Sequence, residues 1–161
     1  MINRYMSLCA RPDAVAVIRG SENHPDIKGA LRFCRTVKGV LVVAEVSGLP
    51  MGENACGLPV LGIHIHEGVA CTGNTSDPFA DTRAHYNPKK CPHPAHAGDM
   101  PPLFVSHGYA FLAFITDRFS LDEIIGKTVI IHSAADDFKT QPSGNSGQKI
   151  ACGEIKRSGR V

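Results

Sequence analysis

The sequence predicts an all-β protein built as an antiparallel sandwich or barrel. Seven short segments are rich in Val, Ile and Phe and are bounded by Gly, Pro, Asn and Asp, as strands usually are. One short stretch has the signals of a helix, and two long stretches rich in Gly, Pro, Ser and Asp interrupt the pattern. Many short strands with almost no helix are typical of packed or closed antiparallel sheets.

The expected strands are 14–20, 29–34, 40–46, 61–67, 109–116, 128–134 and 149–155. Within 40–46, Val42 and Val46 fall on one face and Glu45 on the other, which is the period of two of a half-buried strand. A short helix is expected at 119–126, because Ser120 precedes Glu123 by three residues as in a capping box.

Two long connections, 68–108 and 133–148, separate the later strands. Connections of this length without secondary structure are uncommon in a compact domain, and those that persist are usually functional or disordered. Pro88, Pro92 and Pro94 argue against a helix in the first connection. We expect one domain over 1–161, with a flexible N-terminal stretch at 1–13.

Composition and charge exclude several classes of partner. Lys and Arg total 17 against 15 Asp and Glu, and no block of like charge occurs, so nucleic acid and acidic membranes are poor candidates. The longest apolar runs fall well short of the ~20 residues of a membrane span. The N-terminus lacks the apolar core of a leader, so we expect the cytoplasm, with export after leader removal as the alternative. Six cysteines are compatible with both.

Two segments expected to be strands carry histidines suited to a metal. His64 and His66 are two residues apart, so a strand would point both imidazoles to the same face. His132 closes another apolar run and would also lie on a strand. Imidazole nitrogens suit copper and zinc, so these three side chains are candidate ligands.

The first long connection offers a second ligand set. Zinc prefers four nitrogen, sulfur or oxygen ligands, and this loop supplies His85, His93, His96 and Asp99. Cys91 is a competing thiolate ligand that ranks below the aspartate. The remaining histidines, His24 and His107, are expected to be ordinary polar residues.

The order of these motifs resembles the copper/zinc superoxide dismutases, in their bacterial type. The matching motifs run from about 27 to 155 and include "GIHIHEG", "AHYNP", "HAGDM", "GKTVIIHSAADD" and "GNSGQKIACGEI". The resemblance implies an eight-stranded Greek-key β-barrel, flattened as a sandwich, with two long functional loops. It also implies disproportionation of superoxide to dioxygen and hydrogen peroxide by a Cu(II)/Cu(I) cycle at a histidine-bridged copper-zinc site.

The resemblance assigns roles to individual residues. Copper would be bound by His64, His66, His85 and His132, and zinc by His85, His93, His96 and Asp99. The imidazolate of His85 would bridge both metals and exchange a proton during turnover. Asp136 would hydrogen-bond histidines of both metal sites without touching either metal, and Cys71 and Cys152 would form an intrasubunit disulfide.

Lys149 departs from the family pattern, which has an arginine at this position. Lysine keeps the positive charge but loses the planar fork, so we expect anion guidance at a reduced rate. The alternative is that Lys149 is a strand side chain that faces solvent.

The cysteines other than Cys71 and Cys152 are also atypical. Cys9 and Cys34 are expected to pack in the core, and Cys91 either pairs with Cys56, adds a thiol beside zinc or has no function.

The resemblance also bears on function and partners. The expected activity is that of an enzyme acting on superoxide, a small anion. A non-catalytic protein of the same fold that stores or delivers copper or zinc is the alternative, and a zinc hydrolase ranks below both. We expect no nucleic acid and no membrane span, a homodimer, and a copper donor whose identity the sequence does not give.

Overall fold

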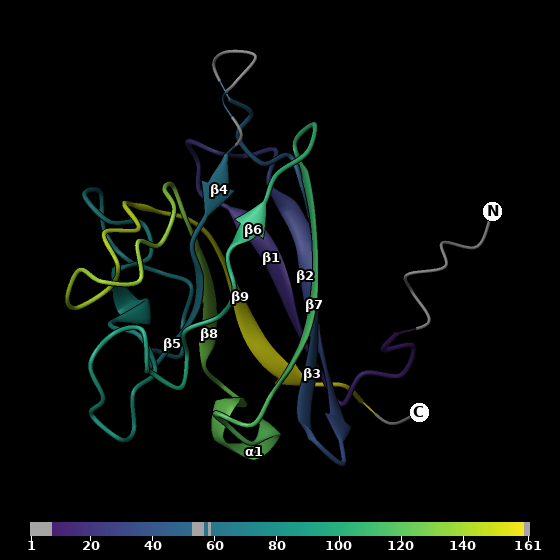
Figure 1. The fold of residues 1–161 in the computed structure, drawn as a ribbon. Helices are drawn as coiled ribbons and strands as arrows, with labels where there is room; N and C mark the ends of the chain where they lie inside the picture. The colour runs from purple at the N-terminus through teal and green to yellow at the C-terminus, as the bar shows by residue number, and fades with distance from the viewer. Residues whose placement is uncertain (1–7, 53–56, 58, 160–161) are drawn as a thin grey trace.

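Seven antiparallel strands form one strongly curled sheet in the computed structural model, which describes residues 8–52, 57 and 59–159 (Figure 1). Their order across the sheet is β5-β8-β9-β1-β2-β3-β7. Their bounds are β1 Ala14–Gly20, β2 Lys28–Thr36, β3 Gly39–Ser47, β5 Ile63–His66, β7 Tyr109–Thr116, β8 Thr128–His132 and β9 Lys149–Arg157. Strand β3 pairs with β7 instead of its successor, so the topology agrees with the predicted Greek-key barrel.

A short strand pair links the two edges of this sheet. Strand β4 (Val60–Leu61) pairs with β6 (Leu103–Phe104). Strand β4 leads into β5 through Gly62, and β6 precedes β7 along the chain. Counting β4 and β5 as one interrupted strand gives the eight strands expected of the barrel. Neither two-residue strand was predicted, because a pairing so short leaves no period-two pattern.

All seven predicted strands are present, two of them with the predicted bounds. The predicted helix is α1 (Leu121–Ile124), and the backbone N–H of Ser120 donates to the Glu123 carboxylate at 2.6 Å, as in a capping box. Among the described residues, no helix is long and apolar enough to span a bilayer.

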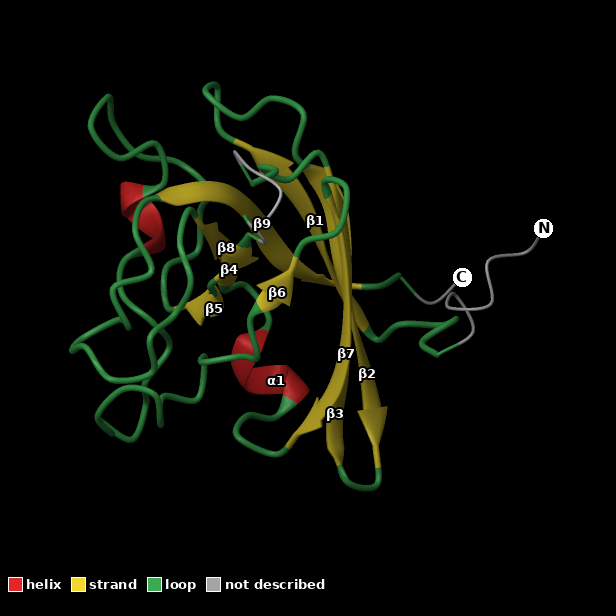
Figure 2. Ribbon diagram, turned by 45° about the horizontal axis from the view of Figure 1, so that its top comes forward, coloured by secondary structure: helices red, strands yellow, loops and turns green. Residues whose placement is uncertain are grey.

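Apolar side chains fill the inside of the curled sheet, and Leu31, Phe33 and Val42 are completely buried there. The two long connections gather together outside β5 and β8, on the side away from β2 and β3 (Figures 1 and 2). The first connection contains a short 3-10 helix, η2 (Ala80–Thr82). Strand β5 is therefore buried on both faces: Ile63 and Ile65 join the core, while His64 and His66 are covered from the loop side.

Two disulfides tie outlying segments to the barrel. Cys71 bonds to Cys152 and so anchors the first long connection to β9, which confirms the predicted pairing. Cys9 bonds to Cys34 of β2. The prediction that these two cysteines only pack in the core was therefore wrong. Cys9 is buried, but it is also covalently bonded to Cys34, and a single sequence does not show which cysteines pair.

Candidate metal centre

The loop segments that carry His85 and Asp99 are held against strand β5 by backbone hydrogen bonds. The N–H of Ile65 donates to the carbonyl of Gly98, and the N–H of Tyr86 donates to the carbonyl of Ile65, both at 2.8 Å. Residues 85 and 99 thereby face residues 66 and 64 of the strand. The free edge of β5 thus positions the loop ligands beside the strand ligands.

Four buried histidines form the first ligand group. The group contains His64, His66, His85 and His132, and one ring nitrogen of each lies within 4.8 Å of one ring nitrogen of every other member. The Nε2 atoms of His66 and His132 lie 3.4 Å apart, and the ring centroids of His64 and His85 lie 4.0 Å apart. His132 stands at the end of β8, where a register irregularity follows Ile131.

The outer nitrogens of this group are occupied by protein acceptors. His66 Nδ1 donates to the carbonyl of Arg83 at 2.8 Å, and His132 Nδ1 donates to the carbonyl of Gly147 at 3.4 Å. His64 Nε2 lies 2.8 Å from Asp136 Oδ2. Since carbonyls and carboxylates only accept, these contacts fix the tautomers and leave the opposite nitrogens as lone pairs facing one another.

The second ligand group shares His85 with the first. It contains His85, His93, His96 and Asp99, again with all ligand atoms within 4.8 Å of one another. Asp99 Oδ1 lies 2.8 Å from His85 Nδ1 and 3.4 Å from His96 Nδ1, and Asp99 Oδ2 lies 3.1 Å from His93 Nδ1. Three imidazoles and one carboxylate are a donor set typical of zinc.

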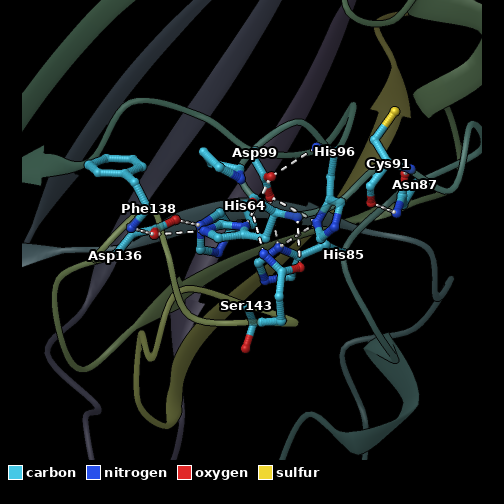
Figure 3. A network of polar contacts seen from close by, with 12 residues as sticks. His64, His85, Asn87, Cys91, His96, Asp99, Asp136, Phe138 and Ser143 are labelled. Atoms are coloured by element: carbon cyan, nitrogen blue, oxygen red, sulfur yellow. Dashed lines mark hydrogen bonds and ion pairs between the residues drawn. The ribbon is translucent and has the colours of Figure 1, made fainter.

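Asp136 lies at one side of the histidine cluster and contacts both groups (Figure 3). Its Oδ2 accepts from His64 Nε2 and its Oδ1 from His93 Nε2, both at 2.8 Å, so one carboxylate orients a histidine of each group. Gly144 packs directly on this bridge at a φ of +69°, and a Cβ built there would lie 2.0 Å from Asp136 Oδ1. Glycine is therefore required at position 144 by both backbone conformation and space.

Burial sets the protonation of the ligands. It lowers the pKa of His64 to about 2, with His85 and His132 adding to the effect, and it lowers the pKa of His132 to about 4. The pKa of His66 also falls well below its ordinary value, chiefly through burial. Burial is the largest single influence on Asp99 and would raise its pKa, but the hydrogen bond from His85 and the charges of His85, His96 and His93 together lower the pKa. Neutral imidazoles and an ionised carboxylate are the forms that bind metals.

Unpartnered nitrogens test whether the two groups fit metal ions. Among the described residues, His64 Nδ1, His85 Nε2 and His93 Nδ1 are buried without a hydrogen bond, and the last of them has only the ion-pair contact with Asp99 Oδ2 at 3.1 Å. A buried polar atom without a partner is costly, and a bound cation would remove that cost. His64 Nδ1 belongs to the first group and His93 Nδ1 to the second, so the protein fits two ions joined by the ring of His85.

A cavity of about 760 Å³ opens beside the first group. The residues that line it include three of the group, His66, His85 and His132, together with Ser21, His24 and Lys149. Lys149 Nζ donates to Asp77 Oδ2 at 2.8 Å and to the carbonyl of Phe79 at 3.0 Å. The lysine is therefore a half-buried residue of the cavity wall and not a strand side chain facing open solvent.

Several residues that hold the site were not singled out from the sequence. Arg118 donates to the carbonyls of Pro94 and His96 at 3.0 and 3.4 Å, and Gln141 pairs with both backbone groups of His93. These contacts join segments distant in sequence, and no spacing pattern signals them. Arg83 and Asp77 were missed for the same reason.

Cys91 is the free cysteine among the described residues and is partly exposed. It is absent from both ligand groups, and its sulfur points away from the imidazoles (Figure 3). Its low rank as a zinc ligand agrees with this position. A bridge between Cys91 and Cys56 lies outside the described residues, because Cys56 is not among them.

Comparison with known proteins gives a consistent result. Residues 27–155 match the family model described as copper/zinc superoxide dismutase. The chain is 30% identical to superoxide dismutase [Cu-Zn] 1 of Aquifex aeolicus, over 97% of this chain and 100% of that protein. It is 34% identical to the superoxide dismutase [Cu-Zn] of Escherichia coli K12, over 80% of this chain and 78% of that protein.

Solved structures agree on the fold. A double mutant of a SOD-like protein from Bacillus subtilis is similar with a TM-score of 0.70 at 29% identity, over 86% of this chain and 94% of that chain. The Cu/Zn superoxide dismutase of Brucella abortus reaches a TM-score of 0.74 at 21% identity, over 89% and 99% of the two chains. Because its identity is only 21%, the similarity to the Brucella abortus structure supports the barrel fold and nothing further.

Proposed function

The chain belongs to the copper/zinc superoxide dismutase family and disproportionates superoxide with copper and zinc, and we propose that its two buried ligand groups divide these metals between them. Copper is bound by His64, His66, His85 and His132, and zinc by His85, His93, His96 and Asp99. The single observation that carries this assignment is that His85 belongs to both groups.

Copper held by the first group would supply the one-electron redox chemistry that oxidises one superoxide to dioxygen and reduces another, with two protons, to hydrogen peroxide. His85 supplies one of those protons. Its Nε2 has no hydrogen-bond partner among the described residues, while its Nδ1 is held by Asp99. Nε2 would be the atom that takes up and releases a proton, while the second ligand group, which includes Asp99, would hold the ring in place.

The remaining residues orient the ligands and admit the substrate. Asp136 holds His64 and His93 at their outer nitrogens, so it couples the geometry of both sites. Lys149 stands on the cavity wall near the first group, where a positive charge attracts a small anion. Because Asp77 pairs with this lysine, the attraction of Lys149 for an anion is weakened.

Superoxide turnover after controlled metal loading tests the assignment. Protein loaded with copper and zinc should turn over superoxide, and protein loaded with zinc alone should not, with metal content and sedimentation measured on the same samples. Full loading without turnover would contradict the enzyme and leave a copper-storing or copper-delivering protein. Sedimentation also checks the homodimer, which stays a prediction.

We further propose that the protein works in an oxidising compartment after export, the alternative to the cytoplasm raised by the sequence. Two disulfides support this, because such bonds persist outside the reducing cytoplasm. Cell fractionation combined with thiol trapping would check it. The expected result is a periplasmic or extracellular protein in which Cys91 reacts and Cys71 does not; a cytoplasmic, fully reduced pool would contradict the proposal.

A further inference from the structure

Four residues with formal charge line the site cavity, and their signs cancel. Glu67 and Asp77 are acidic, and Arg83 and Lys149 are basic. A small anion entering this cavity is therefore drawn by whichever basic group lacks a compensating neighbour. The two basic residues differ in this respect.

Lys149 is compensated. Its Nζ lies 2.8 Å from Asp77 Oδ2, and a second hydrogen bond goes to the carbonyl of Phe79. Opposite charges this close largely cancel at the distance of an approaching anion. The lysine therefore contributes a dipole to the cavity more than a net charge.

Arg83 is not compensated by any described residue. No ion pair or side-chain hydrogen bond to its guanidinium occurs within 8–52, 57 and 59–159, although its backbone N–H and carbonyl are both bonded. The residue is exposed and is one of those that line the cavity. Its carbonyl accepts from His66 Nδ1, so the residue adjoins a ligand of the first group.

The backbone of Arg83 is strained. Its φ of 60° and ψ of −146° lie in a region that glycine adopts freely and other residues rarely do. In this conformation the Arg83 carbonyl accepts from His66 Nδ1 at 2.8 Å, and glycine would adopt the same backbone without strain. The presence of arginine instead of glycine at this position therefore points to a role for the arginine side chain.

We propose that Arg83 is the principal residue that attracts small inorganic anions, superoxide among them, to the copper side of the cavity, and that backbone strain is retained for this purpose. The inference rests on the proposed function of the site. It assigns to Arg83 the attraction that a compensated Lys149 supplies only in part.

Azide binding to the copper- and zinc-loaded protein tests the proposal without turnover. At low ionic strength, Arg83→Ala should weaken azide binding, followed by the copper absorption spectrum, by ~3–10-fold. Arg83→Lys should restore most of the affinity. Asp77→Asn should strengthen binding, because it removes the charge that compensates Lys149. Arg19→Ala is the matched control, since Arg19 is an exposed arginine of β1 outside the cavity.

Unchanged azide affinity in Arg83→Ala, or an equal loss in Arg19→Ala, would overturn the proposal. The loss should also shrink as salt is added, which a structural defect would not cause. If the wild-type protein bound azide with this dependence on Arg83 yet failed to turn over superoxide, the proposed function would fail while the anion site stood.

Thermal unfolding of the metal-free protein tests the strain. Arg83→Gly should raise the midpoint by about 2–4 °C. Arg83→Ala should not raise it, because alanine keeps the Cβ that makes this conformation unfavourable. Both variants should lose azide affinity alike. If the unfolding midpoint of Arg83→Gly were at or below that of the wild type, the backbone of Arg83 would not be strained, and this part of the proposal would be wrong.

Discussion

His85→Ala is expected to abolish superoxide turnover, with a loss greater than about 100-fold, and to reduce the content of both metals. Substituting a residue that only supports a metal ligand already costs about 10–100-fold in metal affinity or activity. His85 is itself a member of both ligand groups, so its loss should cost more. Alanine also removes the nitrogen that exchanges a proton and the ring that Asp99 orients.

Elemental analysis and turnover, measured on the same preparation, check this expectation. His107→Asn is the matched control: His107 lies outside both ligand groups and the cavity, and asparagine tolerates its φ of 50°. The control should keep two metals and full turnover. Circular dichroism of the metal-free variants would verify that both fold. A His85→Ala protein that held copper and zinc and turned over normally would contradict the bridging role.

Replacing both Cys71 and Cys152 with serine is expected to cause a large loss of stability. The bond closes a separation of 81 residues, for which the chain-entropy relation gives about 4.5 kcal/mol. The buried cluster of Phe79, Ile130 and Cys152 that surrounds the bond would loosen as well. Phe79 supplies the carbonyl that holds Lys149, so the cavity wall should become mobile.

Chemical denaturation under non-reducing conditions measures this effect, with Cys9→Ser/Cys34→Ser as the comparison. The second bond spans 25 residues, for which the same relation gives about 3.5 kcal/mol, and it lies away from the metal groups. The first double variant should therefore lose more stability and also bind zinc more weakly, while the second should bind zinc normally. Equal losses and equal zinc affinity would argue against a special role for the Cys71–Cys152 bond.

The sequence predicted the barrel because most of the fold depends on local patterns. Period-two burial marks strands such as β1, continuous apolar runs mark the fully buried β8, and the Ser120 and Glu123 pair marks the helix start. Strands β4 and β6 were not predicted, because a strand of two residues is too short to show an alternating pattern of burial. The Cys9–Cys34 disulfide was not predicted, because the spacing of cysteines in a sequence does not specify which of them pair.

The sequence by itself determined the residue types and order of the metal ligands: two histidines on one strand face, one at the end of another strand, and four loop ligands. Their convergence depends on strand register and on the hydrogen bonds that hold the loop to the edge of β5. Only the tertiary structure decided which charges face the cavity. It paired Lys149 with Asp77 and left Arg83 uncompensated among the described residues, because such contacts join segments whose distance in space has no relation to their distance in sequence.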